Sequence, residues 1–357
     1  MTLPSVRNDL GLSELVLGLI GSATFAGFLA ALLLAGPLAD RRGPRAPTTV
    51  GGVFGAVGAV LVTFAHSPWL LAAGAIAAGS AGGWVWAPYS DIVTRTVAAR
   101  QQPRALATIT TGTGGGLVVL GALATVALLG SWRVVWAGVA IAAVVAGVVN
   151  LRLVPRPHPR PRKNGDRGTS SLFRALRIPG AYSVVYFAVV IVYFTYAADV
   201  LGSGTLPAAA VPALYAVIGC TGVLALSTGA MVRRIGSTRV AAACLAAVGA
   251  ALMILGLAPS SPTAVAVSAA IFGVGYMTGS AVLAVWTAEV VPDRAGAAFT
   301  ACLVVGAVSS VATPAVAGAV IPGLGLGPLL LCSAVLSVLG AVGLYMHSWV
   351  RPNTATP

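Results

Sequence analysis

Long apolar runs alternate with short polar segments along the whole chain. Eleven runs, each bounded by charge, proline or glycine, fall at 14–38, 47–65, 69–90, 105–129, 132–153, 180–201, 210–232, 238–258, 262–288, 297–320 and 326–350. A helix needs about 20 apolar residues to cross a bilayer. In lipid such a run must be helical, because hydrocarbon cannot satisfy an open backbone. The pattern predicts an all-α integral membrane protein with eleven transmembrane helices.

Composition excludes the other broad classes. Of the 357 residues, 58% are hydrophobic and only 8% are charged, and the mean hydropathy is +0.95. Soluble domains are typically about 25% charged, so neither a soluble globular protein nor a disordered one fits. The four cysteines all lie inside apolar runs without metal-like or redox-like spacing, and we interpret them as small hydrophobic residues.

The net charge of +13 reflects membrane topology. The basic residues lie between apolar runs, so we expect no nucleic-acid partner. Alternate loops hold 19 of the 21 Lys and Arg residues, and the other side holds only Arg7 and Arg133. Lys and Arg concentrate in cytoplasmic loops. This asymmetry predicts a cytoplasmic C-terminus and places Met1 outside.

The chain divides into two similar halves. A Pro- and Arg-rich stretch at 154–171 is too polar to be buried, and we interpret it as part of a linker. The segment 36–43 recurs as 229–236, and 104–107 recurs as 294–297, at nearly one offset. We therefore predict an N-terminal bundle at 1–153, a cytoplasmic linker at 154–178 and a C-terminal bundle at 179–357.

These features resemble the major facilitator superfamily (MFS), whose members have twelve helices in two six-helix halves. The loop signature Gly-x-Leu-Ala-Asp-Arg-x-Gly-x-Arg of that family is matched in full by Gly36, Leu38, Ala39, Asp40, Arg41, Gly43 and Arg45. The segment 131–136 is also similar to the family's entry to helix six. The resemblance implies a secondary transporter that moves a small organic solute by alternating access, without a cofactor.

Three departures from the family pattern matter. The segment 2–13 resembles the segment that follows helix one, so the first apolar run matches helix two. Either the gene model begins too late, which we favour, or the protein has eleven helices. The run 75–87 lacks the Arg common in proton antiporters, and the glycines at 112–116 lack the proline common in drug antiporters. The missing Arg and the missing proline argue against a drug:proton antiport function.

The signature loop supplies gating candidates. The resemblance implies that Asp40 holds the halves together in the outward-facing state, against residues 294–297. Arg45 or Arg41 would then pair with Asp91 at the end of helix four. The alternative is an ordinary solvated loop with no gating role.

Polar stripes supply candidates for the substrate cavity. Tyr186 and Tyr193 share a helix face at about 100° per residue, and the resemblance implies that helices one, four, seven and ten line a central cavity. Candidates on helix ten and helix four are Tyr276, Ser280, Ser80 and Trp84. The alternative is hydrogen bonding between packed helices.

Charge inside the membrane would mark a coupling site, and this chain has little. Asp199 is the coupling candidate, with a proton as the coupling ion, unless the family's first helix carries that group. Scarce midplane charge favours a neutral or weakly charged substrate.

The three histidines are dispersed, so we expect neither an enzyme nor a metal site.

The remaining expectations concern class and location. A non-transporting MFS-derived membrane protein, either a sensor or a truncated gene product, is the alternative function. Abundant Ala, Gly, Val and Arg with scarce Lys indicate a GC-rich bacterial genome. We therefore expect a multi-pass monomer in the bacterial plasma membrane, acting as a permease or in efflux, with membrane lipid and substrate as its partners.

Overall fold

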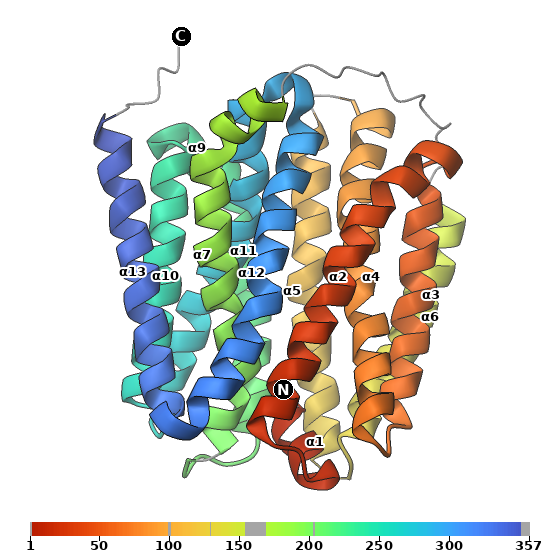
Figure 1. Cartoon of the computed structure of the whole chain (residues 1–357), viewed down its shortest axis with the longest axis vertical. Coiled ribbons are helices and arrows are strands. Elements are labelled where there is room, and N and C mark those ends of the chain that lie inside the picture. Colours follow the sequence, from red (N-terminus) through yellow and green to blue (C-terminus); the bar gives the residue numbers. More distant parts are fainter. Residues whose placement is uncertain (1, 99–100, 129, 154–168, 203, 351–357) are drawn as a thin grey trace.

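The computed structural model describes residues 2–98, 101–128, 130–153, 169–202 and 204–350, and it contains no strand within these ranges (Figure 1). The α-helices are α1 (Leu3–Leu10), α2 (Glu14–Arg42), α3 (Arg45–Thr63), α4 (Pro68–Thr96), α5 (Gln102–Ala127), α6 (Arg133–Leu153), α7 (Thr169–Gly202), α8 (Ala210–Thr221), α9 (Thr228–Ile235), α10 (Ser237–Leu257), α11 (Pro262–Val290), α12 (Ala295–Leu324) and α13 (Leu326–Val350). Ten of the eleven predicted apolar runs each coincide with one α-helix, and the run 210–232 falls on α8 and α9, so the all-α prediction is confirmed.

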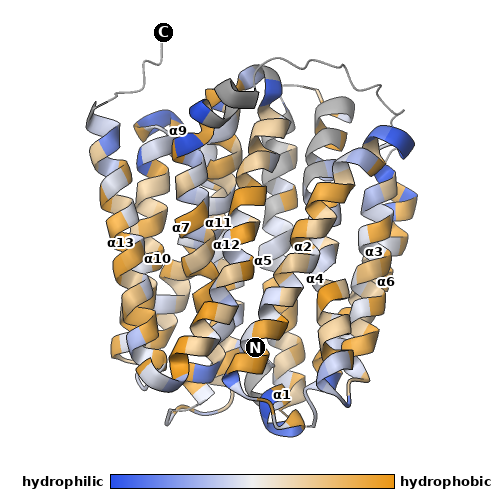
Figure 2. Cartoon of the chain, viewed as in Figure 1, coloured by the Kyte–Doolittle hydropathy of each residue, from blue (hydrophilic) through white to orange (hydrophobic). Residues whose placement is uncertain are grey.

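The helices form a membrane-spanning bundle. Among the described residues, ten spans are long and apolar enough to cross a bilayer, and α5 adds a shorter apolar stretch, Thr111–Ala127. Large apolar side chains such as Trp69, Ile141 and Leu339 lie on the surface, where lipid rather than water stabilises them. Hydrophilic residues gather at the two ends of the helices (Figure 2).

The two ends of the bundle differ in charge. One end, called here the basic end, carries Arg41, Arg42, Arg233 and Arg234 in the last turns of α2 and α9. The opposite end carries α1 and is called the α1 end (Figure 1). The charge asymmetry predicts that the basic end is cytoplasmic.

The internal repeat is visible in the backbone. Gly43 and Gly236 both have φ of 82°, and each donates its N–H over 2.8 Å, to Ala39 and Val232 respectively. Such a positive φ favours glycine. In both halves this turn connects directly to the next helix, so the repeated sequence produces the same local structure twice.

Helix packing follows the same repeat. In the N-terminal half α3 packs on α4 and α6, and in the C-terminal half α10 packs on α11 and α13. Between the halves, α2 packs on α12 and α5 packs on α8. The two halves are therefore pseudo-symmetric bundles that meet through two equivalent helix pairs.

Three local features differ from the sequence expectations. Of the predicted linker, 154–168 lies outside the described residues, whereas 169–178 forms the first turns of α7, supported by buried Leu176 and by Ile178 packed on the core. The predicted run 210–232 is interrupted by a 3-10 segment, Gly222–Ser227. The short helix α1 lies before the first predicted run.

Candidate functional site

Glycines bring the two halves into backbone contact. A Cβ on Gly18 of α2 would lie 2.5 Å from the Pro314 carbonyl oxygen and 3.3 Å from the Gly318 Cα of α12. At the second helix pair, a Cβ on Gly114 would lie 2.9 Å from the carbonyl oxygen of Gly219. Small residues allow membrane helices to approach this closely, so both interfaces between the halves depend on glycine.

A proline inside α12 is bound by both neighbouring helices. The side-chain oxygen of Ser22 on α2 accepts the N–H of Ala315 at 3.0 Å, and the Tyr196 hydroxyl of α7 donates to the Pro314 carbonyl at 3.2 Å. Side chains of neighbouring helices can bond to backbone groups where a proline disturbs a membrane helix. Pro314 therefore joins α2, α7 and α12 at one point.

The tight glycine contacts between the halves are not spread evenly along the helices. Gly18 and Gly318 lie near the α1 end, and Gly114 and Gly219 lie near the helix middles. Toward the basic end, a Cβ on Gly36 of α2 or Gly296 of α12 would meet no atom within 4 Å. The halves therefore make their closest approaches between the helix middles and the α1 end.

A charge cluster crosses between the halves at the α1 end. Arg7 of α1 donates to the Glu14 carboxylate, and its Nη1 lies 3.7 Å from Oδ1 of Asp199 on α7. The Asp199 side chain is 1% exposed, and neither of its oxygens has a hydrogen-bond partner. The coupling candidate is thus a buried carboxylate opposite a single shared guanidinium.

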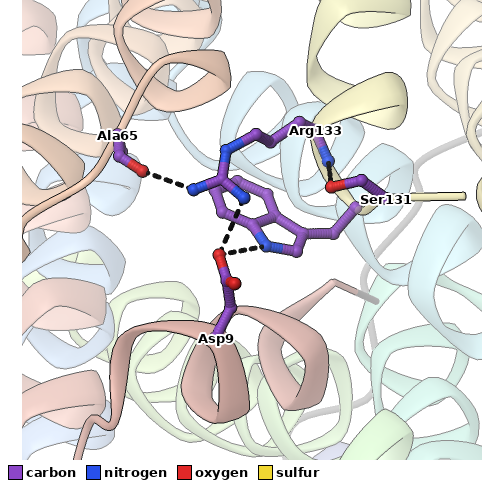
Figure 3. Close-up of polar contacts among 5 residues, drawn as sticks. Asp9, Ala65, Ser131 and Arg133 are labelled. Carbon is purple, nitrogen blue, oxygen red and sulfur yellow. Dashed lines mark hydrogen bonds and ion pairs between the residues drawn. The ribbon is translucent and has the colours of Figure 1, made fainter.

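The other face of α1 binds the N-terminal half (Figure 3). Oδ2 of Asp9 accepts hydrogen bonds from Arg133 Nη1 at 2.7 Å and Trp132 Nε1 at 3.1 Å, and Arg133 also donates to the Ala65 carbonyl at 2.9 Å. The Arg133 hydrogen bond, with the Trp132 hydrogen bond second, lowers the pKa of Asp9 below its usual 3.8. This ion pair therefore holds α1 on the N-terminal half at neutral pH.

The predicted tyrosine stripe lies in a closed seam between α7 and α11. Tyr186 and Tyr193 are fully buried. The Tyr186 hydroxyl donates to the Tyr276 carbonyl and lies 3.0 Å from the Ser280 oxygen, while the Tyr193 hydroxyl lies 2.9 Å from that of Ser268. Tyr276 and Ser280 are only half-buried. The structure therefore brings three of these candidates together and places the tyrosines of α7 behind the residues of α11.

The helix-four candidates are placed apart from that seam. Ser80 is buried and donates to the Ala77 carbonyl of its own helix at 2.7 Å. Trp84 packs toward α3, with its ring centroid 6.3 Å from that of Phe54 and its Cβ against Gly51. In this conformation both side chains make contacts inside the N-terminal half.

The contact predicted for Asp40 of the signature loop is not formed within the part of the chain that the structure describes. The Asp40 side chain makes no hydrogen bond or ion pair with any residue that the structure describes. Gly36 faces open space, Gly43 forms the turn, and Arg41 is exposed. The Asp91 side chain lies outside the described part of the chain, so its predicted pairing with Arg45 or Arg41 stays a prediction.

Comparison with known proteins identifies the family. The family model described as "Major Facilitator Superfamily" matches residues 1–314. The chain is a member of the Major Facilitator Superfamily. A search of curated proteins finds no match.

Two solved MFS structures show the same fold. A mutant form of the nucleoside transporter NupG has a TM-score of 0.72 at 15% identity, over 97% of this chain and 94% of that one. A mutant form of the peptide transporter POT has a TM-score of 0.78 at 14% identity, over 98% of this chain and 89% of that one. At these identities the likeness concerns the fold.

Sequence reasoning missed several polar contacts of this MFS protein. It did not connect Arg7 and Glu14 with Asp199, although all three lie on one predicted side of the membrane. It also missed a network within the N-terminal half, in which Tyr89 donates to Asn150 at 2.6 Å and Asn150 donates to Thr48 at 3.2 Å. Asn150 is the only polar amide inside its apolar run, and that isolation was the available signal.

Proposed function

We propose that this MFS member is a secondary active transporter that moves a small organic solute by alternating access. The observation that carries the proposal is the pair of glycine contacts, at α2–α12 and α5–α8, through which pseudo-symmetric halves meet. Two rigid bundles joined at two equivalent helix pairs can rock about them and expose a central site to each side in turn. Membership of a transporter family supports the same function.

The conformation fits one stage of such a cycle. The closest contacts lie toward the α1 end, and the basic end is predicted to be cytoplasmic. We therefore assign the structure to a state closed on the outside, in the bacterial plasma membrane. In the opposite state Asp40 would reach residues 294–297 and close the basic end. Its lack of a partner here is consistent with a latch that forms only in that state.

The substrate class follows from the scarcity of charge. Half-buried Tyr276 and Ser280 are the candidates for direct contact, and Tyr186 and Tyr193 would position them from behind. Ser80 and Trp84 would contribute only after α4 has moved. A wall of hydroxyl groups and aromatic rings suits a neutral or weakly charged organic molecule. Asp199 is the proposed coupling group, with a proton as the coupling ion.

The first experiment identifies a substrate and then tests alternating access. A thermal-shift screen of the purified protein would cover sugars, amino acids, organic acids, nucleosides and short peptides, since solved relatives in fold include nucleoside and peptide transporters. Counterflow of the best hit in proteoliposomes would then measure transport, and its dependence on the imposed gradients would separate uptake from efflux.

A disulfide across the α2–α12 interface tests the movement itself. A Cβ on Gly21 of α2 would lie 3.1 Å from the Pro314 Cβ of α12, near the Cβ–Cβ spacing of a disulfide, so a Gly21→Cys, Pro314→Cys pair should cross-link. Oxidation should stop counterflow and reduction should restore it, while each single variant remains active. Full transport by the cross-linked protein would refute alternating access. A protein that binds a ligand but never transports it would be a sensor.

A further inference from the structure

A buried chain of hydrogen bonds joins three helices of the N-terminal half close to the basic end. The Tyr89 hydroxyl of α4 donates to Oδ1 of Asn150 on α6 at 2.6 Å, and the Asn150 amide donates to Oγ1 of Thr48 on α3 at 3.2 Å. The Thr48 hydroxyl in turn donates to the Arg45 carbonyl at 2.8 Å. Asn150 is 8% exposed and Thr48 is 2% exposed. The chain therefore ends on the last residue of the signature motif, which is also the first residue of α3.

The direction of these bonds requires an amide at position 150. Thr48 gives its single hydroxyl proton to Arg45, so its oxygen is left to accept from Asn150. At the other end Tyr89 donates, so position 150 must also accept. A carboxylate only accepts, and a hydrocarbon side chain does neither. Asn150 does both, and its replacement by an apolar residue would break the chain at its centre.

The same bonds support the part of α4 that follows a proline. Pro88 lies inside α4 and has no N–H, so the helix loses one of its own hydrogen bonds there. Tyr89 is the next residue, and its bond to Asn150 ties the following turns of α4 to the end of α6. Asn150 therefore fixes the last turns of α4 relative to the first turn of α3.

The matching junction of the C-terminal half is also bridged, but by different residues. Helices α10, α11 and α13 pack on one another as α3, α4 and α6 do. Ser237 of α10 donates to Oε2 of Glu289 on α11 at 2.6 Å, and Nε of Arg239 on α10 donates to the Ser348 oxygen on α13 at 3.4 Å. Polar bridges at the same junction of both halves, built from unlike side chains, point to a requirement of the basic end itself.

We propose that Asn150 is a positioning residue for closure of the basic end and that it acts through Arg45. It holds the first turn of α3, and with it the end of the signature loop, against the last turns of α4. The inference rests on the proposed alternating movement and adds to it a residue outside the signature motif that places the signature arginine. Asn150 has no assigned contact with substrate, so its loss should slow transport without changing the apparent KM.

The first test measures how firmly the α3 turn is held and needs no substrate. In a background with the four native cysteines replaced by Ala, an Ala46→Cys reporter lies half-buried in that turn. Its rate of labelling by a maleimide in nanodiscs reports how often the turn is released. Asn150→Leu should raise that rate about fivefold, because a buried hydrogen bond is lost on each side of the amide. An Ala295→Cys reporter, half-buried at the start of α12, should label at an unchanged rate.

Matched variants separate this chain of bonds from a general loss of stability. Ser337→Ala removes a buried hydroxyl of α13 that donates to the Leu245 carbonyl at 2.7 Å. It loses a comparable bond in the other half and should leave labelling of Ala46→Cys unchanged. Thr48→Val should raise labelling, whereas Thr48→Ser keeps the hydroxyl and should label slowly. The two Thr48 variants decide the question by themselves if Asn150→Leu does not fold.

The second test asks whether the effect passes through Arg45. In counterflow, Asn150→Leu should lower the maximal rate about fivefold and leave the apparent KM unchanged. Arg45→Gln should also lower the maximal rate. The double variant should transport no more slowly than Arg45→Gln alone, because the group that Asn150 positions is already gone. Effects of residues that act as one unit are not additive.

Four results would overturn the proposal. Labelling of Ala46→Cys would not rise in Asn150→Leu or Thr48→Val, or it would rise equally in Ser337→Ala. The losses of rate in the double variant would multiply, or Asn150→Leu would raise the apparent KM at a normal maximal rate. Any of these, with transport by the unchanged protein, removes only the role of Asn150. Absence of counterflow in the unchanged protein would instead refute the proposed function itself.

Discussion

Gly318 of α12 meets Gly18 of α2 backbone to backbone, and no side chain separates them. A Cβ on Gly318 would lie 2.7 Å from the Glu14 carbonyl oxygen and 3.3 Å from the Gly18 Cα. Neither neighbour is a flexible side-chain end that could move aside. The contact between the halves at the α1 end is therefore limited by backbone, and one methyl group is enough to disturb it.

We predict that Gly318→Ala weakens closure at the α1 end, by about 1–3 kcal/mol if overpacking costs what it does elsewhere. With the four native cysteines replaced by Ala, labelling of a Ser22→Cys reporter by a membrane-impermeant maleimide in proteoliposomes should rise accordingly. Gly323→Ala is the matched control, because it adds the same methyl group to the same helix where nothing lies within 4 Å. Equal labelling of the two variants would contradict the prediction.

Asp40→Asn should lower the initial rate of transport on the order of tenfold, while the amount of protein in the membrane stays near normal. The reason is that the outward-facing state would lose its latch at the basic end, whereas the state described here makes no bond with Asp40. Arg42→Gln, a change of one exposed charge at a variable position of the signature, should transport normally. Unchanged flux in Asp40→Asn would remove the gating role.

Tyr186→Phe should lower the free energy of unfolding by about 1 kcal/mol, because its hydroxyl bonds with Tyr276 and Ser280 inside the α7–α11 seam. It should also raise the apparent KM, since Ser280 loses the group that positions it. Thermal unfolding and counterflow measure the two effects. Tyr345→Phe, at an exposed tyrosine, should change neither. A loss of stability with wild-type KM would show that Tyr186 serves packing alone.

Asp9→Asn should lower the melting temperature by a similar amount at about pH 5 and about pH 8. The pKa of Asp9 lies below 3.8 in the folded protein. A lowered folded pKa stabilises above the unfolded value, and that contribution is lost only as the pH falls through the folded value. The α1 anchor is therefore constant over this pH range. A loss that fades between these pH values would mean that Asp9 titrates there.

Sequence patterns predicted most of the fold because each pattern reflects one local constraint. The apolar runs became helical, one of them with a short 3-10 segment inside it, since a backbone in lipid has no other way to satisfy its hydrogen bonds. The turn at Gly43 and Gly236 could be predicted from the repeated sequence, because a positive φ favours glycine at both positions. The break at Gly222–Ser227 and the extension of α7 were not visible, because hydropathy is the same in either backbone conformation.

The candidate site was predicted less completely, because periodicity gives the face of a helix but not its neighbour. Tyr186 and Ser280 were each assigned to a polar stripe, and the structure joins their hydroxyl groups across the α7–α11 seam, while their contact with a substrate stays a prediction. Trp84 belonged to a similar stripe but packs on α3. Identical patterns on two helices thus lead to different surroundings.

The sequence by itself determined the family, the membrane class and the two-half repeat, because these depend on hydrophobic length, loop charge and a contiguous motif. Only the tertiary structure placed Gly18 against Gly318 and set Arg7 between Glu14 and Asp199. Those residues are separated by up to 300 positions along the chain. Their meeting depends on how rigid helices pack, and helix packing is decided by the shapes of whole surfaces rather than by any local run of residues.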